Sequence, residues 1–185
     1  AVIEEAAEAA EYGISFGPPK IDIEAFIARK EAVIEQLTGG LAGLCKARKI
    51  TRMVGRGVFK DRSTLVVSGA DGEQEVRFTD AVIATGSFPF VLPGVPDDPR
   101  IWDSSDALEL RMVPKRFLII GGGIIGLEMA QIYSALGSEI TIVEMLDHII
   151  PPADKDLIQP LFLKLKKKYR IFTKTKVTGI KAAEG

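Results

Sequence analysis

The chain has 185 residues, of which 46% are hydrophobic and 26% charged, and these fractions exclude a disordered, collagen-like or coiled-coil protein. Lys plus Arg number 24 and Asp plus Glu 25, so the net charge of −1 gives no electrostatic basis for nucleic acid or an anionic membrane as the main partner. No apolar run reaches the ~18 residues of a membrane span, and the first residues resemble no signal or transit peptide, so we expect a cytoplasmic protein.

Two helices are predicted at the start of the chain. An Ala- and Glu-rich segment over residues 1–12 predicts a helix that ends at Gly13. This helix has no N-cap residue and the chain does not begin with Met, which suggests a longer polypeptide or a cut terminus. Asp22 stands at the N-cap position of a second, long helix, whose apolar residues recur at spacings of three, four and seven. Gly39-Gly40 within it fits either a close approach of another backbone or a break of the helix.

The pattern then changes to a period of two. Residues 51–59, 63–68 and 74–79 predict three short strands of an antiparallel meander, because turn residues separate them. The apolar run 81–84 predicts a short buried strand. The segment 88–100 contains four prolines and is the predicted linker.

After the linker the pattern becomes α/β. A strand, a glycine turn, a helix and a second strand are predicted at 117–120, 121–126, 127–136 and 140–143. Residues 154–169 predict a helix, in which Pro160 costs ~3 kcal/mol or produces a kink. Residues 169–180 alternate like a strand.

The glycine turn carries the main chemical signal. Its sequence, Gly121-Gly122-Gly123-Ile124-Ile125-Gly126, matches a dinucleotide fingerprint, and Glu144 follows Gly126 by 18 residues at the end of the second strand. The first glycine allows the tight turn, the third lets a diphosphate approach the backbone, and the last lets the helix pack on the sheet. Glu144 would accept hydrogen bonds from the ribose hydroxyls and repel a 2′-phosphate, so NAD is favoured over NADP. The alternative is a glycine turn of a non-nucleotide α/β fold.

Other candidates have weaker support. His148, the only histidine, is better interpreted as a loop residue without a role than as a base. Cys45, the only cysteine, excludes an internal disulfide and is better interpreted as a buried thiol than as a nucleophile. Trp102 is expected in the core or at an edge, and the basic run 164–170 on a solvated helix face, with nucleic-acid binding as a minor alternative. No metal site is expected. Glu128 fits either a helix-dipole partner or an acid near the reacting end of a cofactor.

The sequence resembles the dihydrolipoamide dehydrogenases, within the wider pyridine nucleotide-disulfide oxidoreductase family, over essentially its whole length. The stretches that carry the resemblance are LTGGLAGL (37–44), ATGSFPFVLPGVP (84–96), IWDSSDALEL (101–110), VPKRFLIIGGGIIGLEMAQIYSALGS (113–138), VEM (143–145) and PPADKD (151–156). The resemblance implies an α/β protein with parts of two Rossmann-like dinucleotide-binding domains and an antiparallel meander. Residues 1–110 would be the later part of an FAD-binding domain, and 111–185 the first half of an NAD-binding domain.

The resemblance also implies which residues contact the cofactors FAD and NAD. Gly57 and the flavin-side motif Thr85-Gly86-Ser87 would lie against FAD. The NAD residues would be Gly121, Gly122, Gly123, Ile124, Ile125 and Gly126 at the pyrophosphate, Glu144 at the ribose and Val177 at the adenine. Glu128 would lie near the nicotinamide and the flavin, although its usual lysine partner is absent from this sequence. Phe88 stands where an arginine is common, and Pro160 is unusual in its helix.

The implied function is that of a fragment of a dihydrolipoyl dehydrogenase. Such an enzyme reoxidises dihydrolipoamide, with electrons passing to a disulfide, to flavin and then as hydride to NAD. Its partner would be the lipoyl-bearing acyltransferase of a 2-oxo acid dehydrogenase complex, and the parent protein would be a homodimer. The redox cysteine pair and the His-Glu base would lie outside this chain, so we expect no catalytic residue in it and no activity by itself. The alternatives are a non-catalytic dinucleotide-binding module, or a relative of mercuric or glutathione reductase.

Overall fold

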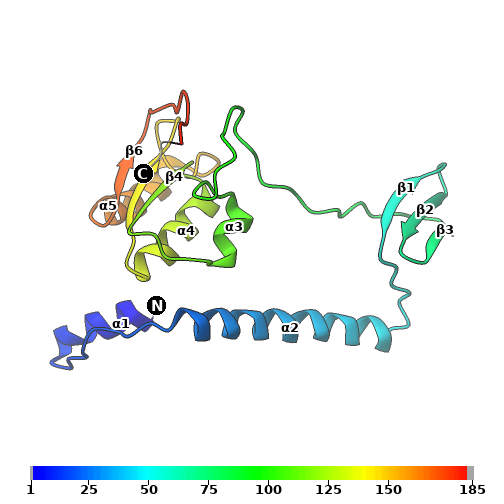
Figure 1. Cartoon of the computed structure of the whole chain (residues 1–185), viewed down its shortest axis with the longest axis horizontal. Helices are drawn as coiled ribbons and strands as arrows, with labels where there is room; N and C mark the ends of the chain where they lie inside the picture. The colour runs from blue at the N-terminus through cyan, green and yellow to red at the C-terminus, as the bar shows by residue number, and fades with distance from the viewer. Residues whose placement is uncertain (1, 183–185) are drawn as a thin grey trace. The chain divides into compact units, whose positions relative to one another are not determined.

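The computed structural model of the chain describes residues 2–182. These residues form two compact units, one spanning Glu24–Phe88 and the other combining the residues up to Ile23 with those from Pro89 onward (Figure 1). The predicted boundary between an FAD-binding and an NAD-binding domain, at residues 110/111, stays a prediction. Ala1 and residues 183–185, which the predicted helix and domain ranges included, lie outside the described residues.

The unit Glu24–Phe88 holds a long helix and a small sheet. Helix α2 (Ile23–Ala47) is continuous through Gly39-Gly40, so the predicted alternative of a helix break is wrong. No described atom lies within 4 Å of a Cβ built on either glycine, so no other backbone approaches them in the described part of the chain. The apolar stripe of α2 is exposed, as Leu37 at 64% and Leu41 at 63% show.

The sheet of this unit is the predicted antiparallel meander. Its strands are β1 (Arg56–Phe59), β2 (Thr64–Gly69) and β3 (Gly72–Arg77), in the order β1-β2-β3. The tight β2–β3 hairpin closes between Gly69 and Gly72, and Gly72 has a φ of 98° that favours glycine. The prediction of three meander strands is therefore confirmed.

The predicted buried strand at 81–84 is wrong. These residues form no strand, and Val82 is 92% exposed. A short apolar run becomes a buried strand only when neighbouring strands supply its backbone partners, and none of the strands between residues 2 and 182 pairs with it.

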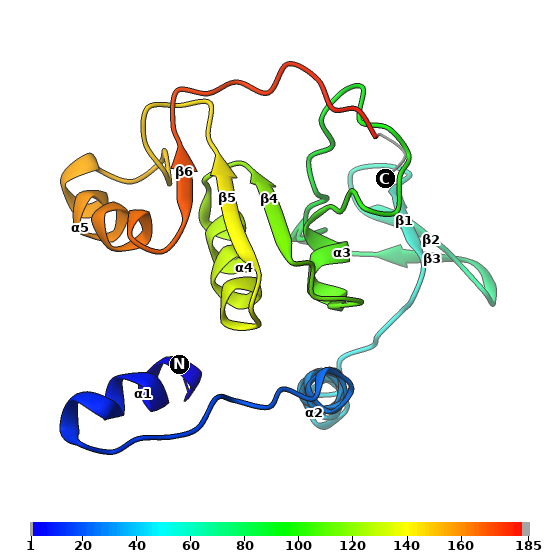
Figure 2. The ribbon, with the colours of Figure 1, turned by 60° about the vertical axis from the view of Figure 1, so that its left-hand side comes forward.

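The other unit begins with a short helix and contains a parallel sheet. Helix α1 (Val2–Glu8) continues as the 3-10 turn η1 (Ala9–Tyr12) and ends at Gly13, whose φ is 81°, as predicted. The sheet has the order β4-β5-β6, and Figure 2 shows the three strands side by side with α4 against one face. The bounds are β4 (Arg116–Ile120), α4 (Ile124–Ala135), β5 (Glu139–Val143), α5 (Lys155–Lys166) and β6 (Arg170–Phe172).

The later elements differ from prediction in extent. Helix α5 continues through Pro160 and ends at Lys166. The strand predicted over 169–180 is reduced to β6, because only three of its residues pair with β5. Beyond Phe172 the backbone instead makes single hydrogen bonds, from Lys174 N–H to Leu146 O and from Thr175 N–H to Glu144 O.

The core of this unit centres on Tyr133 of α4. Tyr133, Ile142 and Ile149 are fully buried. The Tyr133 ring lies 4.5 Å from that of Phe117 and 6.1 Å from that of Trp102, between ring centroids. Trp102 therefore packs with other aromatic rings, as predicted. The Tyr133 hydroxyl donates to the carbonyl of Ala107 at 2.8 Å, which joins α4 to helix α3 (Ser104–Glu109).

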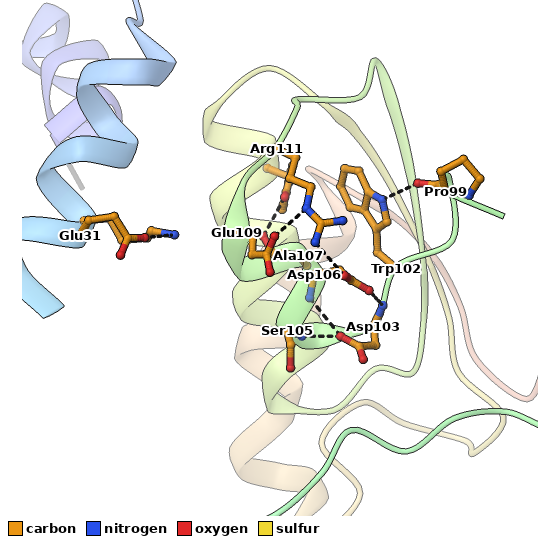
Figure 3. A network of polar contacts seen from close by, with 11 residues as sticks. Glu31, Pro99, Trp102, Asp103, Ser105, Asp106, Ala107, Glu109 and Arg111 are labelled. Atoms are coloured by element: carbon orange, nitrogen blue, oxygen red, sulfur yellow. Dashed lines mark hydrogen bonds and ion pairs between the residues drawn. The ribbon is translucent and has the colours of Figure 1, made fainter. Parts of the chain in front are cut away.

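A capping box starts α3 (Figure 3). The Asp103 carboxylate accepts from the backbone N–H of Ser105 at 2.7 Å and of Asp106 at 3.0 Å, and the Asp106 carboxylate accepts from Asp103 N–H at 3.1 Å. Three backbone N–H groups at the start of α3 thereby receive an acceptor.

Asp103→Ala is expected to lower the free energy of unfolding by about 1 kcal/mol, because the cap is lost. Asp103→Asn keeps an acceptor oxygen and should lose much less. The matched control is Asp97→Ala, which removes an exposed carboxylate and should change stability by less than about 0.5 kcal/mol. Urea unfolding of the three variants measures these differences. Equal midpoints for Asp103→Ala and Asp97→Ala would contradict the capping role.

Candidate functional site

A glycine turn joins β4 to α4, and it favours glycine at two places, one for its backbone conformation and one for lack of space. Gly121 has a φ of 108°, and its N–H donates to Val143 O at 2.8 Å. A Cβ on Gly126 would lie 2.3 Å from the carbonyl oxygen of Gly121 and 3.1 Å from Cγ2 of Ile119. The tight turn and the close helix–strand packing predicted for these two glycines are therefore both present.

The middle of the turn is open. A Cβ on Gly123 would meet no described atom within 4 Å. Gly123 is the N-cap residue of α4, and no side chain caps this helix. Helix N-termini present unpaired N–H groups and a partial positive charge, and these features suit a phosphate group. The turn thus combines open space with backbone donors.

Glu144 directly follows β5, and its side chain is hydrogen-bonded to the glycine turn. Its side chain is buried, with 7% of the residue exposed. Its Oε2 atom accepts from Gly122 N–H at 2.7 Å, and its Oε1 atom accepts from Leu146 N–H at 2.7 Å. Sequence spacing placed Glu144 beside the turn, but these two backbone partners were not predicted. No pattern of residues indicates them, because the Gly122 bond spans 22 positions.

The loop after β5 contains a second cluster that the sequence did not predict. Asp147 accepts from Lys155 Nζ with one carboxylate oxygen and contacts His148 Nδ1 with the other. The hydrogen bonds from Lys155 and His148 lower the pKa of Asp147 to about 2. His148 therefore has a hydrogen-bonding partner in this loop, and its interpretation as a loop residue without a functional role stays a prediction. The only sequence signal for this cluster is the position of Asp147, eight residues before Lys155 at the start of α5.

The other predicted site residues lie apart from the turn along the chain. Gly57 is in β1, opposite Val67, and Thr85-Gly86-Ser87 lies in the exposed irregular segment after β3. Both belong to the unit Glu24–Phe88, whereas the glycine turn belongs to the other unit. Glu128 is exposed on α4. Val177 is partly exposed beyond β6. Of the predicted residues, the structure thus brings together the six of the turn and Glu144.

Within the described residues, the remaining candidates form no further site. Cys45 on α2 is a free thiol that is partly exposed, so its predicted burial is wrong. In residues 2–182 no group of three or more His, Cys, Asp or Glu side chains is placed to hold a metal ion. Among the helices of the same residues, none is both long and apolar enough to cross a membrane. The basic run 164–170 extends from the last turn of α5 to the first residue of β6, and its Lys168 pairs with Glu4.

Comparison with known proteins gives one family. The model of the family "Pyridine nucleotide-disulphide oxidoreductase" matches residues 2–185. Dihydrolipoyl dehydrogenase of Vibrio cholerae is 52% identical over 184 residues, which are 99% of this chain and 39% of that protein. Dihydrolipoyl dehydrogenase of Haemophilus influenzae is 51% identical over 185 residues, again 39% of its length. The chain therefore spans about two fifths of these curated relatives.

Solved structures agree with this result. The HOCl-induced flavoprotein disulfide reductase RclA from Escherichia coli matches with a TM-score of 0.73 and 26% identity, over 95% of this chain and 38% of that one. LpdA from Mycobacterium tuberculosis, at 24% identity, shares the fold, with a TM-score of 0.80 over 96% of this chain and 40% of that one. The α/β fold and the resemblance seen in the sequence are thus confirmed. The chain belongs to the pyridine nucleotide-disulphide oxidoreductase family.

Proposed function

We propose that this chain is part of a dihydrolipoyl dehydrogenase, an oxidoreductase that reoxidises dihydrolipoamide with NAD as the electron acceptor. The observation that carries the proposal is the open glycine turn at the uncapped start of α4, with Glu144 beside it. Identity of about half of all residues to two dihydrolipoyl dehydrogenases selects this enzyme within the family. In the proposed arrangement, residues 1–110 are the later part of an FAD-binding domain and 111–185 the first half of an NAD-binding domain.

The residues of the turn fit an NAD diphosphate. The space beside Gly123 and the first N–H groups of α4 would receive the diphosphate, including the amides of Ile124 and Ile125. Glu144 would accept from the ribose hydroxyls with the lone pairs that its two backbone partners leave free. Met145 at 58% exposure and Leu146 at 44% border this position, and neither can pair with a 2′-phosphate. The arrangement therefore supports NAD rather than NADP.

The other cofactor contacts are proposed from the family resemblance. Val177 would contact the adenine through its backbone, and Glu128 would lie near the nicotinamide and the flavin. Gly57 and Thr85-Gly86-Ser87 would lie against FAD; a Cβ on Gly86, whose φ is 77°, would meet no described atom within 4 Å. When bound, the two cofactors supply the electron and hydride transfer, while these residues bind and orient them.

The proposal extends to partners and location. The full-length protein would be a cytoplasmic homodimer that serves the lipoyl-bearing acyltransferase of a 2-oxo acid dehydrogenase complex. Neither a nucleic acid nor a membrane is among the proposed partners. The alternatives, a non-catalytic dinucleotide-binding module or a mercuric or glutathione reductase relative, have no specific observation in their favour.

A purified 185-residue chain is expected to show no lipoamide reductase activity, because a disulfide needs two cysteines and this sequence has one. A full-length protein that contains this sequence is expected to reduce lipoamide with NADH, and to prefer NAD over NADP by at least about tenfold in calorimetric titration. Turnover by the 185-residue chain would refute the expectation of inactivity. A full-length protein that binds NAD but leaves lipoamide unreacted would favour the non-catalytic alternative.

A further inference from the structure

The carboxylate of Glu144 joins two loops that are distant in sequence. One oxygen holds the N–H of Gly122, in the turn after β4, and the other holds the N–H of Leu146, in the loop after β5. Both donor–acceptor distances are 2.7 Å, within the short range of hydrogen bonds to a charged acceptor. Because the side chain is buried, water competes little with these two donors.

Both backbone polar groups of Gly122 are hydrogen-bonded. Its N–H is bound by Glu144, and its carbonyl oxygen accepts from Ile150 N–H at 2.9 Å. A Cβ on Gly122 would lie 3.0 Å from Cγ2 of Ile149 and 3.2 Å from Cβ of Glu144. The turn and the loop after β5 are therefore in close contact at this point. All of these contacts are made by groups of the protein itself.

We propose that Glu144 is a positioning residue, which holds the diphosphate-binding turn in its open shape before the nucleotide arrives. This inference rests on the proposed function for its ligand, and it adds a second task to the sugar contact already proposed. A group that only contacted the sugar would matter only for ligands with ribose hydroxyls. A group that shapes the turn matters for every ligand that places a diphosphate there. Glu144→Ala should therefore weaken binding even of a nucleotide without those hydroxyls.

The first test follows backbone amides in the full-length protein that contains this sequence, without nucleotide. Hydrogen exchange at Gly122 and Leu146 is measured by NMR in the parent protein, Glu144→Ala and Glu144→Gln. Exchange at both amides should be about 10 to 100 times faster in Glu144→Ala, because a hydrogen bond to a charged group is lost. In Glu144→Gln only one amide should lose protection, because the side-chain amide keeps one acceptor oxygen and its NH2 group cannot accept.

The matched control is Glu139→Ala, at the opposite end of β5. Glu139 is also a glutamate of this strand, and it is exposed. Its loss should leave exchange at Gly122 and Leu146 unchanged. Rapid exchange at Gly122 in the parent protein, or equal protection in the parent and Glu144→Ala, would overturn the proposal. The first of these outcomes needs no variant, so the test holds even if Glu144→Ala folds poorly.

The second test compares two ligands by calorimetry: NAD, and NAD whose adenosine ribose lacks its 2′- and 3′-hydroxyls. Glu144→Ala should weaken both, with a loss of at least about tenfold for the dideoxy ligand, whereas Glu139→Ala should weaken neither. A loss confined to NAD would overturn the proposal and leave Glu144 as a sugar contact alone. Failure of the parent protein to bind NAD would instead refute the proposed function, and the exchange measurement would still decide whether Glu144 shapes the turn.

Discussion

Replacing Tyr133 by alanine is expected to lower the free energy of unfolding by about 3–5 kcal/mol, the usual loss when a large buried aromatic side chain is truncated. Tyr133 is 0% exposed, and its ring packs against those of Phe117 and Trp102. Its hydroxyl also satisfies the carbonyl of Ala107. The substitution therefore leaves a cavity, breaks an aromatic cluster and removes the hydrogen bond between α3 and α4.

Tyr133→Phe separates these contributions. It keeps the ring and removes only the hydroxyl, so it should cost about 1–3 kcal/mol, the penalty for a buried carbonyl left without its donor. Tyr12→Ala is the matched control, because Tyr12 is 82% exposed and should contribute less than about 0.5 kcal/mol.

Urea unfolding followed by tryptophan fluorescence measures all three variants. Trp102 is the only tryptophan of the chain, and its ring belongs to the cluster that the variants disturb. Similar midpoints for Tyr133→Ala and Tyr12→Ala would show that α4 does not pack as described.

Replacing Gly126 by alanine is the second substitution with a large expected effect. The added Cβ would lie 2.3 Å from the Gly121 carbonyl oxygen, closer than real Cβ atoms approach any backbone atom. The start of α4 must then move away from β4, at a cost of about 1–3 kcal/mol or more for an overpacked site. Because the turn itself is displaced, NAD binding by the full-length protein should also fall sharply.

Gly43→Ala is the control for this change. Gly43 lies inside α2, and no described atom comes within 4 Å of its added Cβ. Alanine is a better helix former by about 1 kcal/mol, so this variant should gain stability where Gly126→Ala loses it. Circular dichroism during urea unfolding gives both values. A change of the same sign in the two variants would contradict the close packing at Gly126.

The parts of the fold that follow local rules could be predicted from the sequence. The positive φ of Gly121, the end of the first helix at Gly13 and the meander hairpins all depend on residue types a few positions apart. The same is true of the strand–turn–helix order around Gly121–Gly126. These features were predictable because only a few residue types tolerate the backbone conformations that they require.

Other features depend on partners that are distant in sequence. Residues 81–84 have the composition of a strand, but a strand exists only where another strand pairs with it. The two amide partners of Glu144 and the shared position of Asp147 between Lys155 and His148 are set by how loops meet in three dimensions. A residue pattern can place an acid near a turn, but it does not specify which donors the acid will find there.

The two sheets differ in how far along the chain their paired strands lie. In the meander, β1 to β3 span Arg56–Arg77, so each pairing closes a loop of a few residues. In the parallel sheet, β4 to β6 span Arg116–Phe172, and every pairing must wait for a crossover that includes a helix. Long closures form slowly, because chain entropy is lost before the contacts are gained. The meander should therefore assemble early during synthesis, and the glycine turn, whose shape needs β4 and β5 already paired, should mature last.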